Sequence, residues 1–262
     1  MSKKSRFLLA AALASFLFFI FIALSYEWRY YALAVDVVIL VFLIWFSLEI
    51  KRSTPFWLKI TTVVLPVAFF IGYGLFTAII PYKVIIGLCL SLFLGIFIYV
   101  IFLVENVFLF AVERKTVPLY RAAYTVGSVL MLLTAFFLFD SLFSFNLSCW
   151  WNLVMAFFIT LFLFIYHFFS VMIELPEDEW QLKNIGPYVI IPSLGIAQMA
   201  LVISFWPIGI FKGSIYLTAL IYIIAGLLQA DLRGRLFERT WLTFLWIGIA
   251  VILGIILMTE WR

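Results

Sequence analysis

Apolar residues run in nine long, continuous stretches that fill most of the chain, and charged residues are confined to the short gaps between them. A helix rises about 1.5 Å per residue and the hydrocarbon core of a bilayer is about 30 Å thick, so roughly 20 apolar residues cross it. The pattern therefore predicts an all-α, polytopic transmembrane helix bundle of about nine spans, within a range of eight to ten. The predicted spans cover residues 7–25, 30–48, 60–80, 84–112, 122–145, 151–173, 186–210, 214–228 and 240–258.

Helices are favoured over barrel strands because the stretches are continuously apolar and do not alternate in segments of about ten residues. The segment 214–228 is the shortest predicted span. The gaps are too short for a second hydrophobic core, so residues 1–262 are expected to form a single integral membrane domain with no soluble domain.

Composition agrees with a lipid environment. Hydrophobic residues make up 67% of the chain, charged residues 11%, and the mean hydropathy is +1.23. Soluble proteins average roughly 45–50% apolar and about 25% charged residues. The lipid bilayer is the expected partner, and the scattered basic residues do not form a nucleic-acid surface.

The distribution of basic residues predicts the orientation. Of the 17 Lys and Arg residues, 13 fall in the gaps on one side of the predicted bundle and four on the other. Positive loops stay in the cytoplasm, so the N-terminus is expected inside and the C-terminus outside. The bacterial cytoplasmic membrane is the favoured location, although an endoplasmic-reticulum protein would follow the same rules. The first span resembles a signal peptide but exceeds the usual apolar length, so we expect an uncleaved anchor.

The fourth span carries Glu105 and Asn106 toward its cytoplasmic end. Glu105 lies on the edge of a stripe formed by Gly87, Ser91 and Gly95, whose small side chains permit close approach of another helix. A buried carboxylate of this kind can bind a proton or cation. The alternative, which we favour, is a solvated or ion-paired carboxylate near the inner interface.

The sixth span contains the only histidine, His167, on a small and polar side that includes Ala156, Thr160 and Ser170. By depth it is level with Glu105, so the two suit a proton relay or acid–base pair. A histidine that is merely hydrogen-bonded between helices is the more common case.

The seventh span carries Gln198 near mid-membrane, six residues after Pro192. Proline removes a backbone donor and disfavours helix in the preceding residue, which predicts a kink near Ile191. A broken helix there would expose carbonyl groups to a substrate. Packing without a ligand is the favoured alternative.

The gap 174–184 is unusually acidic and holds Glu177, Asp178, Glu179 and Trp180. Pairing with the basic gap that contains Arg233, Arg235 and Arg239 is the simpler interpretation. Docking of a basic cytoplasmic partner is the alternative, so these four residues form a candidate partner-docking loop.

No phosphate-binding loop, zinc-protease motif, nucleophile elbow or pair of Asp-rich motifs is present, so we expect no cofactor, metal or catalytic residues. The first hypothesis is a non-catalytic membrane component that interacts or assembles with other membrane subunits. The second is a small transporter or channel with a polar path at Glu105, Asn106, His167 and Gln198. The third is an intramembrane enzyme acting on a lipid or isoprenoid, with Glu105 and His167 as acid and base.

Overall fold

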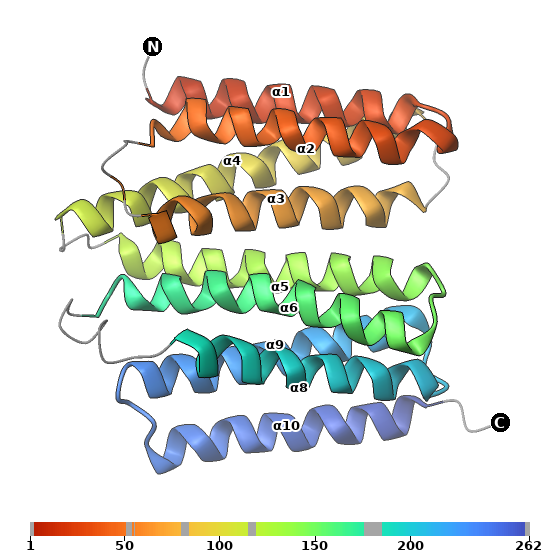
Figure 1. Ribbon diagram of the computed structural model, residues 1–262, viewed down its shortest axis with the longest axis vertical. Helices are drawn as coiled ribbons and strands as arrows, with labels where there is room; N and C mark the ends of the chain where they lie inside the picture. Colours follow the sequence, from red (N-terminus) through yellow and green to blue (C-terminus); the bar gives the residue numbers. More distant parts are fainter. Residues whose placement is uncertain are drawn as a thin grey trace. The chain divides into compact units, whose positions relative to one another are not determined.

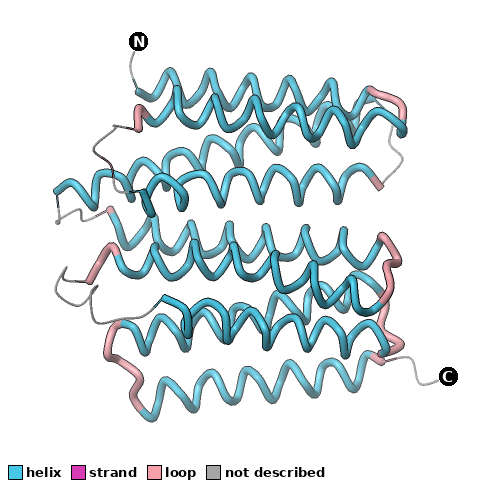
Figure 2. The backbone as a smooth tube through the Cα atoms, in the orientation of Figure 1, coloured by secondary structure: helices cyan, strands magenta, loops and turns pink. Residues whose placement is uncertain are grey.

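The computed structural model describes residues 3–50, 54, 56–79, 84–114, 119–175 and 185–259. Within these ranges, nine helices are long and apolar enough to cross a membrane, and no strand is present (Figures 1 and 2). The predicted all-α class is therefore confirmed, and nine described helices have the length and composition that the nine predicted spans require. The chain divides into two compact units, unit 1 (Met1–Thr134) and unit 2 (Ala135–Arg262), and each is described by itself.

Unit 1 is built around four helices that pack in a closed ring of neighbours. Its helices are α1 (Lys3–Ala23), α2 (Tyr26–Leu48), α3 (Phe56–Ala78), α4 (Val84–Arg114) and the beginning of α5 (Tyr120–Ser144). Helix α1 packs against α2 and α4, and α3 packs against the same two helices.

The seam between α1 and α4 uses the small residues of the fourth span. A Cβ added to Gly95 would lie 2.9 Å from the Cβ of Ser15, and one added to Gly87 would lie 2.9 Å from Ile22. Ser15 Oγ donates a hydrogen bond of 2.7 Å to the carbonyl oxygen of Ser91. The predicted close helix approach along this stripe is confirmed.

One end of unit 1 is held by Arg29, in the first turns of α2. Its guanidinium donates to the carbonyl oxygens of Leu24 at 3.1 Å, Ile22 at 3.2 Å and Ala78 at 3.2 Å. The last carbonyl groups of a helix lack intrahelical partners and carry partial negative charge, so a cation at this place satisfies them. Arg29 thereby joins the ends of α1 and α3.

The other end of the α1–α2 pair is held by an ion pair. Arg6 near the start of α1 donates to the carboxylate of Glu49, the residue that follows α2. This hydrogen bond to the Arg6 guanidinium lowers the pKa of Glu49 below its usual range.

Unit 2 has α6 and α9 at its centre. It contains the rest of α5, α6 (Cys149–Met172), α8 (Ile185–Phe205), α9 (Ile210–Leu232) and α10 (Glu238–Met258), with labels as in Figure 1. Helix α6 packs against α8 and α9, α8 also contacts α9, and α10 packs against α9.

Two predicted boundaries in unit 2 were wrong. The seventh span, expected to reach residue 210, ends at Phe205, and the eighth, expected to be the shortest, runs for 23 residues from Ile210 to Leu232. Pro207 follows α8 and has no backbone N–H to continue the hydrogen bonding of that helix, so the chain turns there. Helix α9 then begins before Gly213, which the predicted spans had left in a gap. Helix α8 continues through Pro192, so the backbone is not broken beside Gln198.

Candidate functional site

Glu105 lies inside unit 1, where α4 faces its neighbours. The residue is only 1% exposed, whereas the adjacent Asn106 is half-buried. The direction of Glu105 follows from the stripe of Gly87, Ser91 and Gly95, which places this side of α4 against α1. The expectation that Glu105 points into the bundle agrees with this burial.

His167 is buried in unit 2 between two helices. The residue is 3% exposed, and its Nε2 lies 2.9 Å from the carbonyl oxygen of Ala225 in α9. Because a carbonyl oxygen only accepts, Nε2 carries the proton and donates it to this bond. The predicted small side of α6 is buried as well, since Ala156 and Thr160 are fully covered and Ser170 is buried. His167 therefore fastens α6 to α9.

The packing around His167 extends to α8 and α10. Thr160 Oγ1 of α6 donates to the carbonyl oxygen of Ala156 in its own helix at 2.7 Å and also lies 3.5 Å from the carbonyl oxygen of Ser193 in α8. Gly226, which follows Ala225, leaves room for the ring of Phe244, because a Cβ on Gly226 would clash with that ring. The histidine thus lies where α6 meets α9, and α10 packs on the same stretch of α9.

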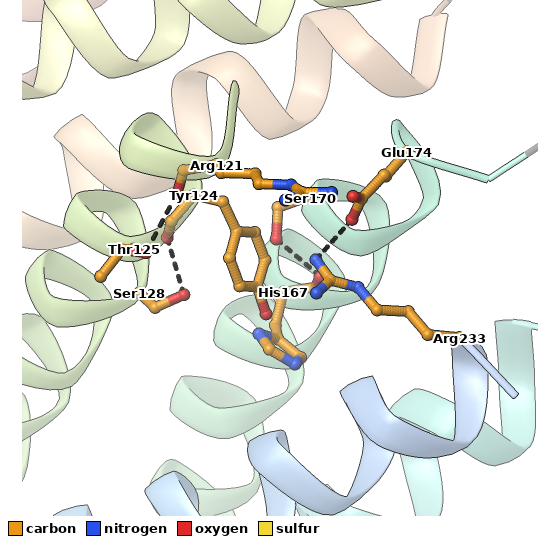
Figure 3. Close-up of polar contacts among 8 residues, drawn as sticks. All are labelled: Arg121, Tyr124, Thr125, Ser128, His167, Ser170, Glu174 and Arg233. Carbon is orange, nitrogen blue, oxygen red and sulfur yellow. Dashed lines mark hydrogen bonds and ion pairs between the residues drawn. The ribbon is translucent and has the colours of Figure 1, made fainter. Parts of the chain in front are cut away.

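An ion pair closes the end of unit 2 nearest His167. Arg233, just after α9, contacts the carboxylate of Glu174, just after α6, at 2.7 Å (Figure 3). Tyr188 in the first turns of α8 donates to the carboxylate of Asp231 at 2.8 Å. The predicted pairing between the acidic gap and the gap containing Arg233 is realised at Glu174.

The predicted polar residues do not all point inward. Gln198 is exposed on α8, whereas His167 of the same unit is buried. Hydropathy places Gln198 at mid-membrane, but it does not tell which side of a helix other helices cover. The candidate docking residues Glu177, Asp178, Glu179 and Trp180 lie outside the described residues.

Sequence reasoning missed several side-chain hydrogen bonds between helices. Asn152 in the first turn of α6 donates to Ser204 Oγ of α8 at 3.0 Å, and Trp206 Nε1 donates to Thr259 Oγ1 at 2.7 Å after α10. Each pair joins residues about fifty positions apart, so spacing along the chain does not reveal it. In the part of the chain that the structure describes, no group of three or more His, Cys, Asp or Glu side chains is placed to hold a metal ion.

Comparison with known protein families gives a match over most of the chain. The model of a family described as "Protein of unknown function (DUF5656)" matches residues 7–258, which reach from the first helix to the last. No curated protein and no solved structure matches this chain.

Proposed function

This chain belongs to the DUF5656 family, and we propose that it is a non-catalytic component of the membrane that assembles with another membrane protein through α10. Nine apolar helices in the described ranges are compatible with a multi-pass membrane protein. The proposal rests on α10, which the other described helices leave largely uncovered.

Helix α10 differs from every other described span in its burial. None of its residues is buried, whereas 28–56% of the apolar window is buried in each of the other eight helices. Its contact with α9 runs through Phe244, which packs on Gly226 and lies 6.2 Å from the ring of Tyr222. After Thr243, the remaining surface of α10 is apolar and open to lipid or to a second protein.

Trp246 favours a protein over lipid as the occupant. It is 66% exposed and lies eight residues after the start of α10, about 12 Å along the helix. That depth is near the middle of a hydrocarbon layer about 30 Å thick, whereas tryptophan prefers the interface, where its N–H finds a partner. A neighbouring transmembrane helix with a hydroxyl, amide or carbonyl acceptor at mid-depth would satisfy this N–H.

Purification in mild detergent tests the proposal. A tagged full-length chain is expected to copurify with a stoichiometric membrane partner, and Trp246→Ala is expected to lose it. Phe42→Ala is the matched control, because Phe42 is an aromatic residue of α2 that is 71% exposed. A solitary monomer under several mild conditions, or loss of the partner in both variants, would contradict the proposal. Purification of the chain only with copies of itself would also contradict it, because the partner would then be a second copy of this chain.

We also propose the orientation and the location. The partition of 13 basic residues against four supports a cytoplasmic start of α1 and an external end of α10. Together with the short gaps between the spans, it leads us to propose a bacterial cytoplasmic membrane. Reporter fusions after residue 50 and after residue 259 are expected to report the cytoplasm and the exterior, respectively. The single membrane domain and the docking role of Glu177, Asp178, Glu179 and Trp180 stay predictions.

Transport is the second candidate, and one observation favours it. Glu105 and His167 are both ionisable and both buried within apolar helices, which is uncommon without a role in binding or transfer of ions. Flux into proteoliposomes across a proton gradient tests this candidate. Unchanged flux in Glu105→Gln and His167→Ala would show that these two residues take no part in transport.

A further inference from the structure

Asp36 lies in the middle of α2, inside unit 1. It is only 7% exposed, and it stands ten residues after Tyr26 and twelve before Leu48, the two ends of the helix. At about 1.5 Å per residue, these intervals place it roughly 15 Å from one end and roughly 18 Å from the other. A hydrocarbon core is about 30 Å thick, so the carboxyl group of Asp36 lies within the hydrocarbon layer.

The carboxyl group of Asp36 has no partner at this depth. Its Oδ2 is buried and makes no hydrogen bond to any described residue. Buried polar groups are normally hydrogen-bonded, and an ionised carboxylate is among the most costly groups to leave bare. Ionisable residues inside transmembrane segments commonly bind ions or protons.

The side of α2 that carries Asp36 is otherwise apolar. Leu33, Leu40 and Ile44 share this side and are buried. A Cβ on Gly74 of α3 would lie 2.6 Å from Leu33 Cδ1, so α2 and α3 touch one turn before Asp36. Asp36 therefore stands on the covered side of its helix, where apolar side chains cannot stabilise a negative charge.

No basic side chain is placed to balance an ionised Asp36. Among the described residues, no ion pair involves it. The nearest charge on its own side of α2 is Arg29, seven residues or about 10 Å earlier, and the guanidinium of Arg29 already donates to three backbone carbonyl groups. The charged residues of α1, α3 and α4, the helices that pack against α2, all stand toward its Glu49 end: Lys3, Lys4, Arg6, Lys59, Glu105, Glu113 and Arg114.

The other titratable groups of these three helices carry no positive charge. Tyr73 of α3 is buried and donates its hydroxyl to the carbonyl oxygen of Leu90 at 3.0 Å. On α4, Cys89 is exposed and Tyr99 is half-buried. A thiol and a phenol are neutral when protonated, so none of the three balances a carboxylate.

A proton satisfies this carboxyl group where a metal ion does not. One oxygen atom binds a proton and becomes a neutral acid that also donates a hydrogen bond. Hard metal cations need about six or more oxygen ligands, and Asp36 is the one acidic residue at this depth in the described part of unit 1.

We propose that Asp36 is a reversible proton-binding site within unit 1. The carboxylate accepts one proton to form the carboxylic acid, and it returns that proton to water when the pH rises; no other bond forms or breaks. The site is independent of the proposed assembly through α10, and it is separate from the candidate path at Glu105 and His167.

Infrared spectroscopy of the full-length chain in lipid tests the site, because a carboxylic acid and a carboxylate absorb at different frequencies. A heavy-carbon label in the side-chain carboxyl groups separates the aspartate bands from those of glutamate. The chain has four aspartates, Asp36, Asp140, Asp178 and Asp231. In a triple variant with Asp140→Asn, Asp178→Asn and Asp231→Asn, only Asp36 carries the label.

The triple variant is expected to show a labelled acid band at about pH 5.5, where an ordinary aspartate is ionised by roughly forty to one. The band should shift in heavy water, because the bound proton exchanges, and should convert reversibly to a carboxylate band as the pH rises. A carboxylate band at about pH 5.5, as for an ionised or metal-bound Asp36, would overturn the proposal. An acid band that neither exchanges nor titrates would also overturn it.

Two single variants assign the band to Asp36. Asp36→Asn is expected to remove from the labelled wild type the band seen in the triple variant. Asp231→Asn is the matched control and is expected to keep it, because Asp231 is exposed and accepts a hydrogen bond from Tyr188. Retention of the band in Asp36→Asn, or its loss in Asp231→Asn, would overturn the assignment. The amide band of the same spectra reports whether each variant keeps its helices, and the triple variant decides the matter if Asp36→Asn does not fold.

Discussion

Ser15 of α1 lies directly against Gly95 of α4, so that a Cβ on Gly95 would stand 2.9 Å from the Ser15 Cβ and 3.2 Å from its Oγ. The hydroxyl that this contact positions donates to the carbonyl oxygen of Ser91. Lipid tails are as apolar as the helices, so close packing and interhelical hydrogen bonds hold such helices together. This contact is therefore a place where one methyl group changes the stability of unit 1.

Gly95→Ala is expected to destabilise the protein by about 1–3 kcal/mol, because the added methyl forces α1 away from α4. Gly195→Ala is the control, since an added Cβ there meets nothing within 4 Å and alanine favours helix. Thermal unfolding of the purified chain in detergent measures both. Equal unfolding midpoints in the two variants would show that the α1–α4 contact is not tight.

His167→Leu is expected to destabilise the protein by about 1 kcal/mol, because it removes the hydrogen bond between α6 and α9. His167→Gln keeps a donor and should recover part of the loss. The same unfolding assay compares them. If glutamine behaves like leucine, the hydrogen bond to Ala225 does not contribute to stability.

The pair Glu174 and Arg233 is expected to show a coupling energy of about 0.5–1 kcal/mol in a double-mutant cycle. Both side chains are partly exposed, at 32% and 20%, so water screens the attraction. Glu174→Gln, Arg233→Gln and the double variant supply the cycle. Added salt should reduce the coupling, and additive effects of the single variants would contradict a direct pair.

Glu49 is expected to stabilise the protein at neutral pH and to lose that effect in acid. Its pKa is lowered by Arg6, so its contribution is fully present above the ordinary glutamate pKa of about 4.3 and disappears as the pH falls through the lower folded value. The unfolding midpoints of wild type and Glu49→Gln should therefore differ at pH 7 and converge as the pH falls through the folded pKa of Glu49. Arg6→Gln should remove the same pH-dependent difference, and parallel curves at all pH values would contradict the pairing.

The sequence predicted the number of spans and several inward-facing residues, because hydropathy and helical spacing are local properties. Glu105 follows from its spacing to Gly87, and the small side of α6 follows from the spacing of Thr160 and His167. The exposure of Gln198 could not be predicted, because it depends on which helices cover α8.

Hydrogen bonds between residues far apart in the chain, and helix ends within apolar sequence, could not be predicted either. The bond between Asn152 and Ser204 joins different helices and leaves no pattern along the chain. The boundary near Pro207 was misplaced because apolar residues continue on both sides of the turn, so hydropathy does not mark where the helix stops.

Arg29 has a consequence for how the chain enters the membrane. Two of its three carbonyl partners, Ile22 and Leu24, precede it, but the third, Ala78, is synthesised 49 residues later. When the first hairpin leaves the ribosome, one of the three carbonyl groups that the Arg29 guanidinium contacts has therefore not yet been made. Insertion of the third helix completes this set of contacts, so Arg29 joins the ends of α1 and α3 only when that helix arrives.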